Sequence, residues 1–140
     1  MEAILTRTLT AERLALLRQF LRFGTVGFGG FIVDTATVYS LRAWAGLYVA
    51  GAVAYVTSAS FNWVVNRVWT FRGRGSHSAH RQWAMFLAAN ALGFVLNRGT
   101  YFTLIKLSPF CHAYPVVAIA AGVAMGMFLN FHLSRTVVFR

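Results

Sequence analysis

Four long apolar runs dominate the pattern of hydrophobic and polar positions along the chain. They cover residues 20–41, 46–68, 83–105 and 114–134, and each is continuously apolar instead of alternating at every second position. A hydrocarbon core about 30 Å thick needs about 20 apolar residues of helix, and each run has that length. Glycine and alanine are frequent within the runs, as in membrane helices that pack closely. The pattern predicts an all-α membrane protein with four transmembrane helices.

Two polar segments divide these runs into blocks. Residues 1–19 precede the first run, and residues 73–82 form a linker with several glycines and serines. In the N-terminal segment and the start of the first run, leucines recur on one helical face and arginines on another, which predicts a short amphipathic surface helix. We therefore expect an N-terminal segment at 1–19, a two-span repeat at 20–72, a linker at 73–82 and a second two-span repeat at 83–140.

The distribution of arginines orients the predicted spans. The segments before the first span, between the second and third, and after the fourth contain ten arginines, whereas the opposite loops contain only Arg42 and Lys106. Because cytoplasmic loops carry an excess of basic residues, this bias predicts that both termini and the linker are cytoplasmic.

Composition excludes several classes of function. The chain has a net charge of +10, but its arginines flank apolar runs instead of covering one polar helix, so we expect a membrane partner and no nucleic acid. Its acids are Glu2, Glu12 and Asp34, too few and too scattered for a carboxylate pair or a metal cage. Its one lysine follows Ile105, so no phosphate-binding Gly-Lys-Ser/Thr step is present. We expect a protein that is not an enzyme and binds no metal or cofactor.

An internal repeat relates the two halves of the chain. Residues 61–72 align with residues 129–140, and the first spans of the two halves align more weakly. Each half would be a hairpin that begins and ends in the cytoplasm, so the halves are predicted to be parallel repeats related by an axis along the membrane normal. The aligned identities are Asn62/Asn130, Arg67/Arg135, Phe71/Phe139 and Arg72/Arg140 in the closing segments, and Phe23/Phe86, Gly30/Gly93, Phe31/Phe94, Thr37/Thr100 and Leu41/Leu104 in the first spans, where Asp34 aligns with Asn97.

The residues of this repeat also carry a resemblance to a known family. The segment 22–27, Arg-Phe-Gly-Thr-Val-Gly, the polar residue deep in the first span and the two closing segments resemble the GtrA-like family of small four-span membrane proteins. The similarity covers about residues 18–140, with Ser134 and Val137 departing from the pattern of the first closing segment. The resemblance implies a bacterial inner-membrane protein that moves polyprenyl-phosphate-linked sugars and works with a partner glycosyltransferase on the cytoplasmic side.

Two stripes of small and polar residues are the first candidate site. In the second and fourth spans, side chains at every fourth position change from small to amide or hydroxyl toward the cytoplasmic end. One interpretation is helix packing, in which an asparagine bonds across a helix pair. The other is that the amides offer sugar hydroxyls hydrogen-bond donors and acceptors. The stripes are Ala54, Ser58, Asn62 and Asn66 in the first half and Gly122, Gly126, Asn130 and Ser134 in the second.

Arg67 and Arg135 end their spans at the depth where a lipid phosphate lies. A guanidinium presents a fork of donors that suits phosphate oxygens, so this pair is a candidate site for the phosphate of the lipid headgroup. The alternative is that both arginines extend to ordinary phospholipid and serve only the positive-inside bias.

Asp34 and Arg98 are the two charged residues placed well within spans. Each costs about 2.5–3.5 kcal/mol at a helix centre, so both are expected to face the protein interior or water. Because Asp34 aligns with Asn97, the residue before Arg98, the two charges lie at similar depths. They would form a structural ion pair, or Arg98 would attract the anionic headgroup, or Asp34 would take up a proton during transport.

These features together predict the translocation of a polyprenyl-phosphate sugar across the bacterial inner membrane for modification of a surface polysaccharide. Four spans enclose little volume, so a homo-oligomer is expected. One alternative is a non-transporting membrane protein that recruits or positions the glycosyltransferase. Another is a proton-coupled exporter of small cations, which Arg98 and the strongly positive protein disfavour.

Overall fold

The computed structural model describes residues 2–75 and 77–140, and the side chains from Thr10 onward within those ranges. All regular elements of this described part are helices, which confirms the all-α prediction. The chain forms two compact units, Met1–Gly73 and Arg74–Arg140.

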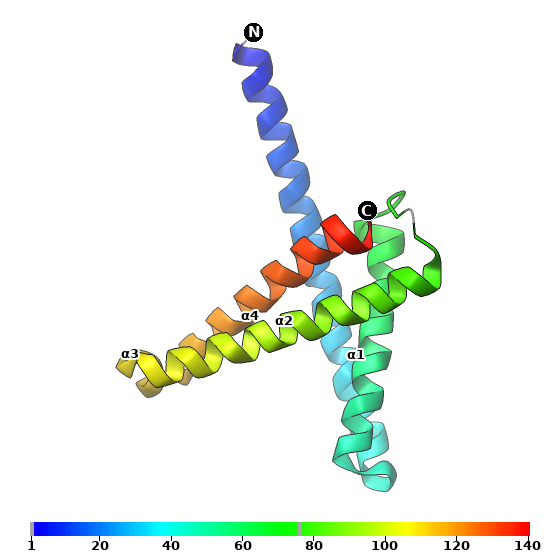
Figure 1. Cartoon of the computed structure of the whole chain (residues 1–140), viewed down its shortest axis with the longest axis vertical. Helices are drawn as coiled ribbons and strands as arrows, with labels where there is room; N and C mark the ends of the chain where they lie inside the picture. The colour runs from blue at the N-terminus through cyan, green and yellow to red at the C-terminus, as the bar shows by residue number, and fades with distance from the viewer. Residues whose placement is uncertain (1, 76) are drawn as a thin grey trace. The chain divides into compact units, whose positions relative to one another are not determined.

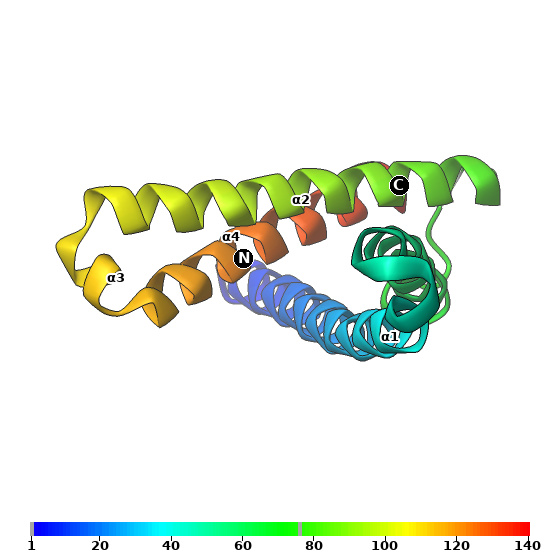
Figure 2. The ribbon, with the colours of Figure 1, turned by 90° about the horizontal axis from the view of Figure 1, so that it is seen from below.

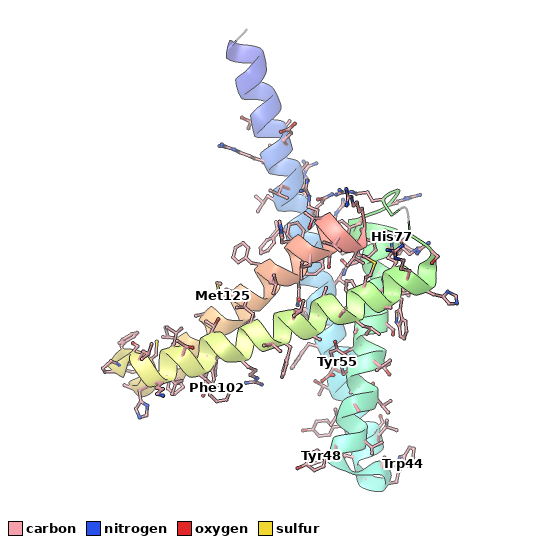
Figure 3. The ribbon with its side chains drawn as sticks, in the orientation of Figure 1. Trp44, Tyr48, Tyr55, His77, Phe102 and Met125 are labelled. Carbon is pink, nitrogen blue, oxygen red and sulfur yellow. The ribbon has the colours of Figure 1, made fainter. Side chains whose placement is uncertain are left out.

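The first unit is a helical hairpin. Helix α1 spans Glu2–Val65 and is interrupted at Gly46, where φ is 80° and ψ is 163°. A positive φ favours glycine because it has no Cβ, and here it lets the chain reverse, as Figure 1 shows. Trp44 and Tyr48 flank the reversal and are exposed (Figure 3). After Val65 the chain continues as the π-helix η1, Asn66–Thr70.

The start of α1 is continuous with the first arm of this hairpin. α1 begins at Glu2, and no interruption precedes Gly46. Leu14, Leu17 and Leu21 are each more than half exposed, so the described structure leaves an apolar face of this segment uncovered. Its placement on a membrane surface stays a prediction.

The second unit is also a hairpin, closed by a short helix. It contains α2 (Ala79–Leu107), α3 (Pro109–Ala113), α4 (Pro115–Leu133) and the π-helix η2 (Ser134–Val138). α2 and α4 run side by side, with α3 at the turn between them (Figures 1 and 2). Pro109 and Pro115 occupy the first positions of their helices, where a missing backbone N–H costs nothing.

Two stretches of the described residues are long and apolar enough to cross a membrane, Thr10–Thr70 and Pro115–Val138. The first contains the reversal at Gly46, so it consists of two arms. α2 is not among these stretches, and it includes Asn90, Asn97 and Arg98. A four-span arrangement therefore stays a prediction for this arm.

Candidate functional site

The stripes found in the sequence form an inner face of each hairpin, and each has a turn-side half and a closing-side half. The turn-side half begins with Ala50 and Ala54 in the first unit and with Ala118 and Gly122 in the second, all buried. In the second unit α4 lies so close to α2 that a Cβ on Gly126 would be 2.8 Å from the carbonyl oxygen of Gly93. This half therefore consists of small residues that let two helices approach closely.

The closing-side half brings asparagines against glycines in both units. The Asn62 amide lies where a Cβ on Gly30 would be, and the Asn130 amide lies in the same way against Gly93. The two contacts join residues that are equivalent in the repeat, so the units share this packing. The Oδ1 atoms of Asn62 and Asn130 are buried and accept no hydrogen bond among the described residues. Helix packing accounts for where these asparagines lie but leaves their oxygens unsatisfied.

Three further buried oxygens lie at the ends of the stripes. Asn66 Oδ1, Thr70 Oγ1 and Ser134 Oγ have no hydrogen-bond partner in the described part of the chain, and their residues are 1%, 4% and 0% exposed. Leaving a buried polar atom unsatisfied costs about 1–3 kcal/mol, so these groups oppose folding unless a ligand or water bonds them. Thr70 was not identified from the sequence, although it continues the four-residue spacing from Asn66.

Both stripes end in π-helices. The Phe71 N–H donates to the Asn66 carbonyl oxygen over 2.8 Å, and the Phe139 N–H donates to that of Ser134 over the same distance. Each phenylalanine also packs edge-to-face on the first arm of its own unit, with ring centroids 6.3 Å apart for Phe23 and Phe71 and 6.1 Å for Phe86 and Phe139. π-Helical segments are rare and often mark functional sites, and here both enclose candidate residues.

Two arginines of the first unit lie over tryptophan rings, the candidate Arg67 and also Arg22, which was not identified from the sequence as a site residue. The Arg67 guanidinium carbon is 5.6 Å from the Trp63 ring centroid, and that of Arg22 is 5.5 Å from the Trp69 ring centroid. A ring beneath a guanidinium restricts its motion, and a guanidinium suits phosphate oxygens through its fork of N–H donors. Arg135, at the equivalent position of the second unit, is half-buried at the start of η2.

Asp34 and Arg98 lie in different units, and their pairing stays a prediction. Asp34 is half-buried in the first arm of α1, and Arg98 is exposed on α2 with its guanidinium carbon 5.6 Å from the Phe94 ring centroid. Asn97, the repeat counterpart of Asp34, faces α4, because a Cβ on Gly122 would lie 2.8 Å from its Oδ1.

The comparison with protein families shows which family the chain belongs to. A family model described as GtrA/DPMS, transmembrane domain, matches residues 22–139. The chain belongs to this family. The comparison with curated proteins finds no match.

Membership in the GtrA/DPMS family confirms the resemblance seen in the sequence. It makes the chain a membrane protein whose function relates to polyprenyl-phosphate sugars, in a family whose members are generally non-catalytic. The matched region includes all eight candidate residues, Asp34, Asn62, Asn66, Arg67, Arg98, Asn130, Ser134 and Arg135.

One further buried polar residue of this GtrA/DPMS domain was missed in the sequence. Gln82, near the start of α2, is 1% exposed, and its amide lies against Gly75, whose φ is 114°. Gln19 holds the equivalent position in the first unit, where it is half-buried. The dipeptide Arg-Gln directly precedes the predicted spans at 20–41 and 83–105, and this identity is the signal that would have revealed the pair.

Proposed function

We propose that this protein flips a polyprenyl-phosphate-linked sugar across the bacterial inner membrane for modification of a surface polysaccharide. The observation that carries the proposal is the set of buried, unsatisfied oxygens on the two stripes. In each unit one of them belongs to a residue next to an arginine, Asn66 beside Arg67 and Ser134 beside Arg135. A headgroup made of a sugar and a phosphate needs this combination, because its hydroxyls donate to amide and hydroxyl oxygens while its phosphate accepts from guanidinium.

In the first unit Asn62 and Asn66 would bond a sugar and Arg67 its phosphate, and in the second unit Asn130, Ser134 and Arg135 would have the same roles. The sugar hydroxyls would donate hydrogen bonds to the buried oxygens, which are otherwise unsatisfied or bonded to water, and this would lower the free energy of the bound state. The polyprenyl tail would stay in the lipid, so only the polar headgroup needs a path through the protein. Arg98 would attract the anionic headgroup at mid-depth, and Asp34 would lie beside that path.

The orientation follows from the arginine bias. Four helical arms would cross the membrane as two parallel hairpin repeats with both termini in the cytoplasm, after an amphipathic N-terminal helix. The closing-side residues would then face the leaflet in which a partner glycosyltransferase makes the lipid-linked sugar. A homo-oligomer would supply the volume that four arms lack.

The test is transport of a fluorescent polyprenyl-phosphate sugar by the purified protein in liposomes that contain no transferase. We expect transport by the wild type and a loss of about tenfold in Asn66→Ala, a change that removes a hydrogen-bonding side chain from a bound headgroup. Thr57→Val is the matched control, because the Thr57 hydroxyl is exposed and donates to the Val53 carbonyl oxygen of its own helix over 2.8 Å. Binding without transport by the wild type would contradict flipping and favour recruitment of the transferase.

A further inference from the structure

The two closing ends are equivalent in backbone but differ in chemistry. At several aligned positions the first unit has a more polar, charged or aromatic residue than the second, and four of these pairs lie at or beside the candidate site. The pairs are Arg22 with Met85, Asn66 with Ser134, Trp69 with Val137 and Thr70 with Val138.

Thr70 and Val138 are the most informative pair. The residues are nearly isosteric, and they are 4% and 1% exposed in equivalent π-helices. Valine fills the position in η2, so packing at this site does not require a hydroxyl. The hydroxyl of Thr70 is nevertheless buried without a partner. It is therefore an available hydrogen-bonding group that opposes folding and would be satisfied by a ligand.

The Arg22 and Trp69 pair adds a second guanidinium beside η1. Its cation–π contact cannot form at the equivalent place of the second unit, where methionine and valine occur. With Arg67 over Trp63, the first unit holds two arginines on aromatic rings at one end. Two guanidinium groups suit a phosphodiester, and indole rings offer apolar surface to the carbon face of a sugar ring.

Polar residues that the second unit gains do not offset this difference. Asn90 replaces Gly27, but its Nδ2 donates to the Phe86 carbonyl oxygen over 2.9 Å. Thr136 replaces Val68, but its hydroxyl donates to the His132 carbonyl oxygen over 2.6 Å and its side chain is exposed. Asn90 and Thr136 are satisfied within their own helices, unlike Asn66 and Thr70. His132 replaces Val64, but its side chain is exposed and adds no buried unsatisfied atom.

We infer that the first unit carries the sugar-selective site and that the second unit is its weaker, less selective counterpart. Arg22 and Arg67 bind the phosphate, and Asn66 and Thr70 accept hydrogen bonds from sugar hydroxyls. The ligand class is a sugar phosphate on a polyprenyl chain. Undecorated polyprenyl phosphate has the chain and the phosphate but lacks the sugar. This inference rests on the proposed function.

The experiment measures the affinity of the full-length protein in nanodiscs for two short-chain probes. One probe is a polyprenyl-phosphate hexose, and the other is undecorated polyprenyl phosphate. The hexose is glucose, galactose or mannose, whichever form the wild type binds most tightly. Thr70→Val should weaken hexose binding by about threefold to tenfold, the range of one net hydrogen bond, and leave the undecorated probe unchanged. Arg22→Met should weaken both probes by about tenfold, because both carry the phosphate.

The repeat supplies the controls. Val138→Thr and Val137→Ala change the equivalent positions of the second unit and should leave both affinities unchanged. Ser134→Ala should weaken hexose binding less than Asn66→Ala does. Thermal unfolding separates binding from folding, because Thr70→Val removes an unsatisfied hydroxyl and should not lower the unfolding temperature.

Two results would overturn the inference while leaving flipping intact. One is hexose binding by Thr70→Val at wild-type affinity, and the other is equal losses from Asn66→Ala and Ser134→Ala. A wild type that binds and transports no hexose form would instead remove the proposed function, and this inference with it.

Discussion

The turn-side and closing-side halves of each stripe lie on the same helix but differ in how their polar atoms are satisfied. On the turn side, Ala50, Ala54 and Ala118 are fully buried and bring no side-chain polar atom into the interface. On the closing side, Asn66, Thr70 and Ser134 are buried with unsatisfied oxygens, inside π-helices. The difference teaches that helix packing explains the residues of the turn-side half. It does not explain the buried hydrogen-bonding groups of the closing-side half.

The largest expected effect is in a test of which side of the membrane the closing-side halves face. On a Cys111→Ala background, Leu47→Cys should react with a membrane-impermeant thiol reagent added outside spheroplasts, and Ser78→Cys should react only after lysis. Residue 47 lies beside the turn at Gly46, and residue 78 directly precedes α2 in the predicted cytoplasmic linker 73–82. Cys111 is unsuitable as the label because it is buried. The opposite labelling would place the closing-side half at the outer leaflet.

A bulky residue in the tight part of the second hairpin should have the next largest effect. Gly126→Val puts side-chain carbon against the Gly93 backbone and should destabilise the protein by about 3 kcal/mol or prevent folding, as measured by thermal unfolding in detergent. Gly99→Ala is the control, because a Cβ there meets nothing within 4 Å. Alanine is also the better helix former by about 1 kcal/mol, so this variant should be as stable as the wild type or more so. Equal stability of both variants would argue against close packing of α4 on α2.

Variants of Asp34 and Arg98 test whether these two charged residues are needed for folding or for transport. If they pair, Asp34→Asn and Arg98→Gln should each destabilise by about 3 kcal/mol, and the double variant should regain much of the loss along with transport. We expect the double variant to be stable but inactive, because the headgroup would lack the cation at Arg98. Asparagine fits the Asp34 position by analogy, since Asn97 occupies it in the second unit. A double variant that transports at the wild-type rate would exclude a transport role for either residue, and loss of transport in a folded Asp34→Asn alone would favour a proton role.

The sequence predicted the all-α class and the family, and it suggested the register of the repeat, because long apolar runs and spaced polar identities are visible in the sequence itself. The register aligned Gly30 with Gly93 and Asn62 with Asn130, yet it did not predict that each asparagine lies against the glycine of its own unit. That contact depends on where the hairpin turns, which a positive φ at Gly46 sets in the first unit. The π-helices were also missed, because a shift of one residue in backbone hydrogen bonding leaves no pattern in composition. Thr70 and Gln82 had signals in the sequence, a four-residue spacing and a repeated Arg-Gln dipeptide, but these signals do not show that the side chains are buried, which is a tertiary property.

The central claim is that the closing-side polar groups serve a ligand and not the fold, and Asn66→Leu tests it most directly. Leucine has a similar shape and removes a buried amide oxygen that has no partner. We predict that the variant unfolds at a temperature equal to or above that of the wild type, with a gain of about 1 kcal/mol, and that it transports the polyprenyl-phosphate sugar at least about tenfold more slowly. A variant that is destabilised and transports in proportion to its folded fraction would show that Asn66 serves packing, and would contradict the account.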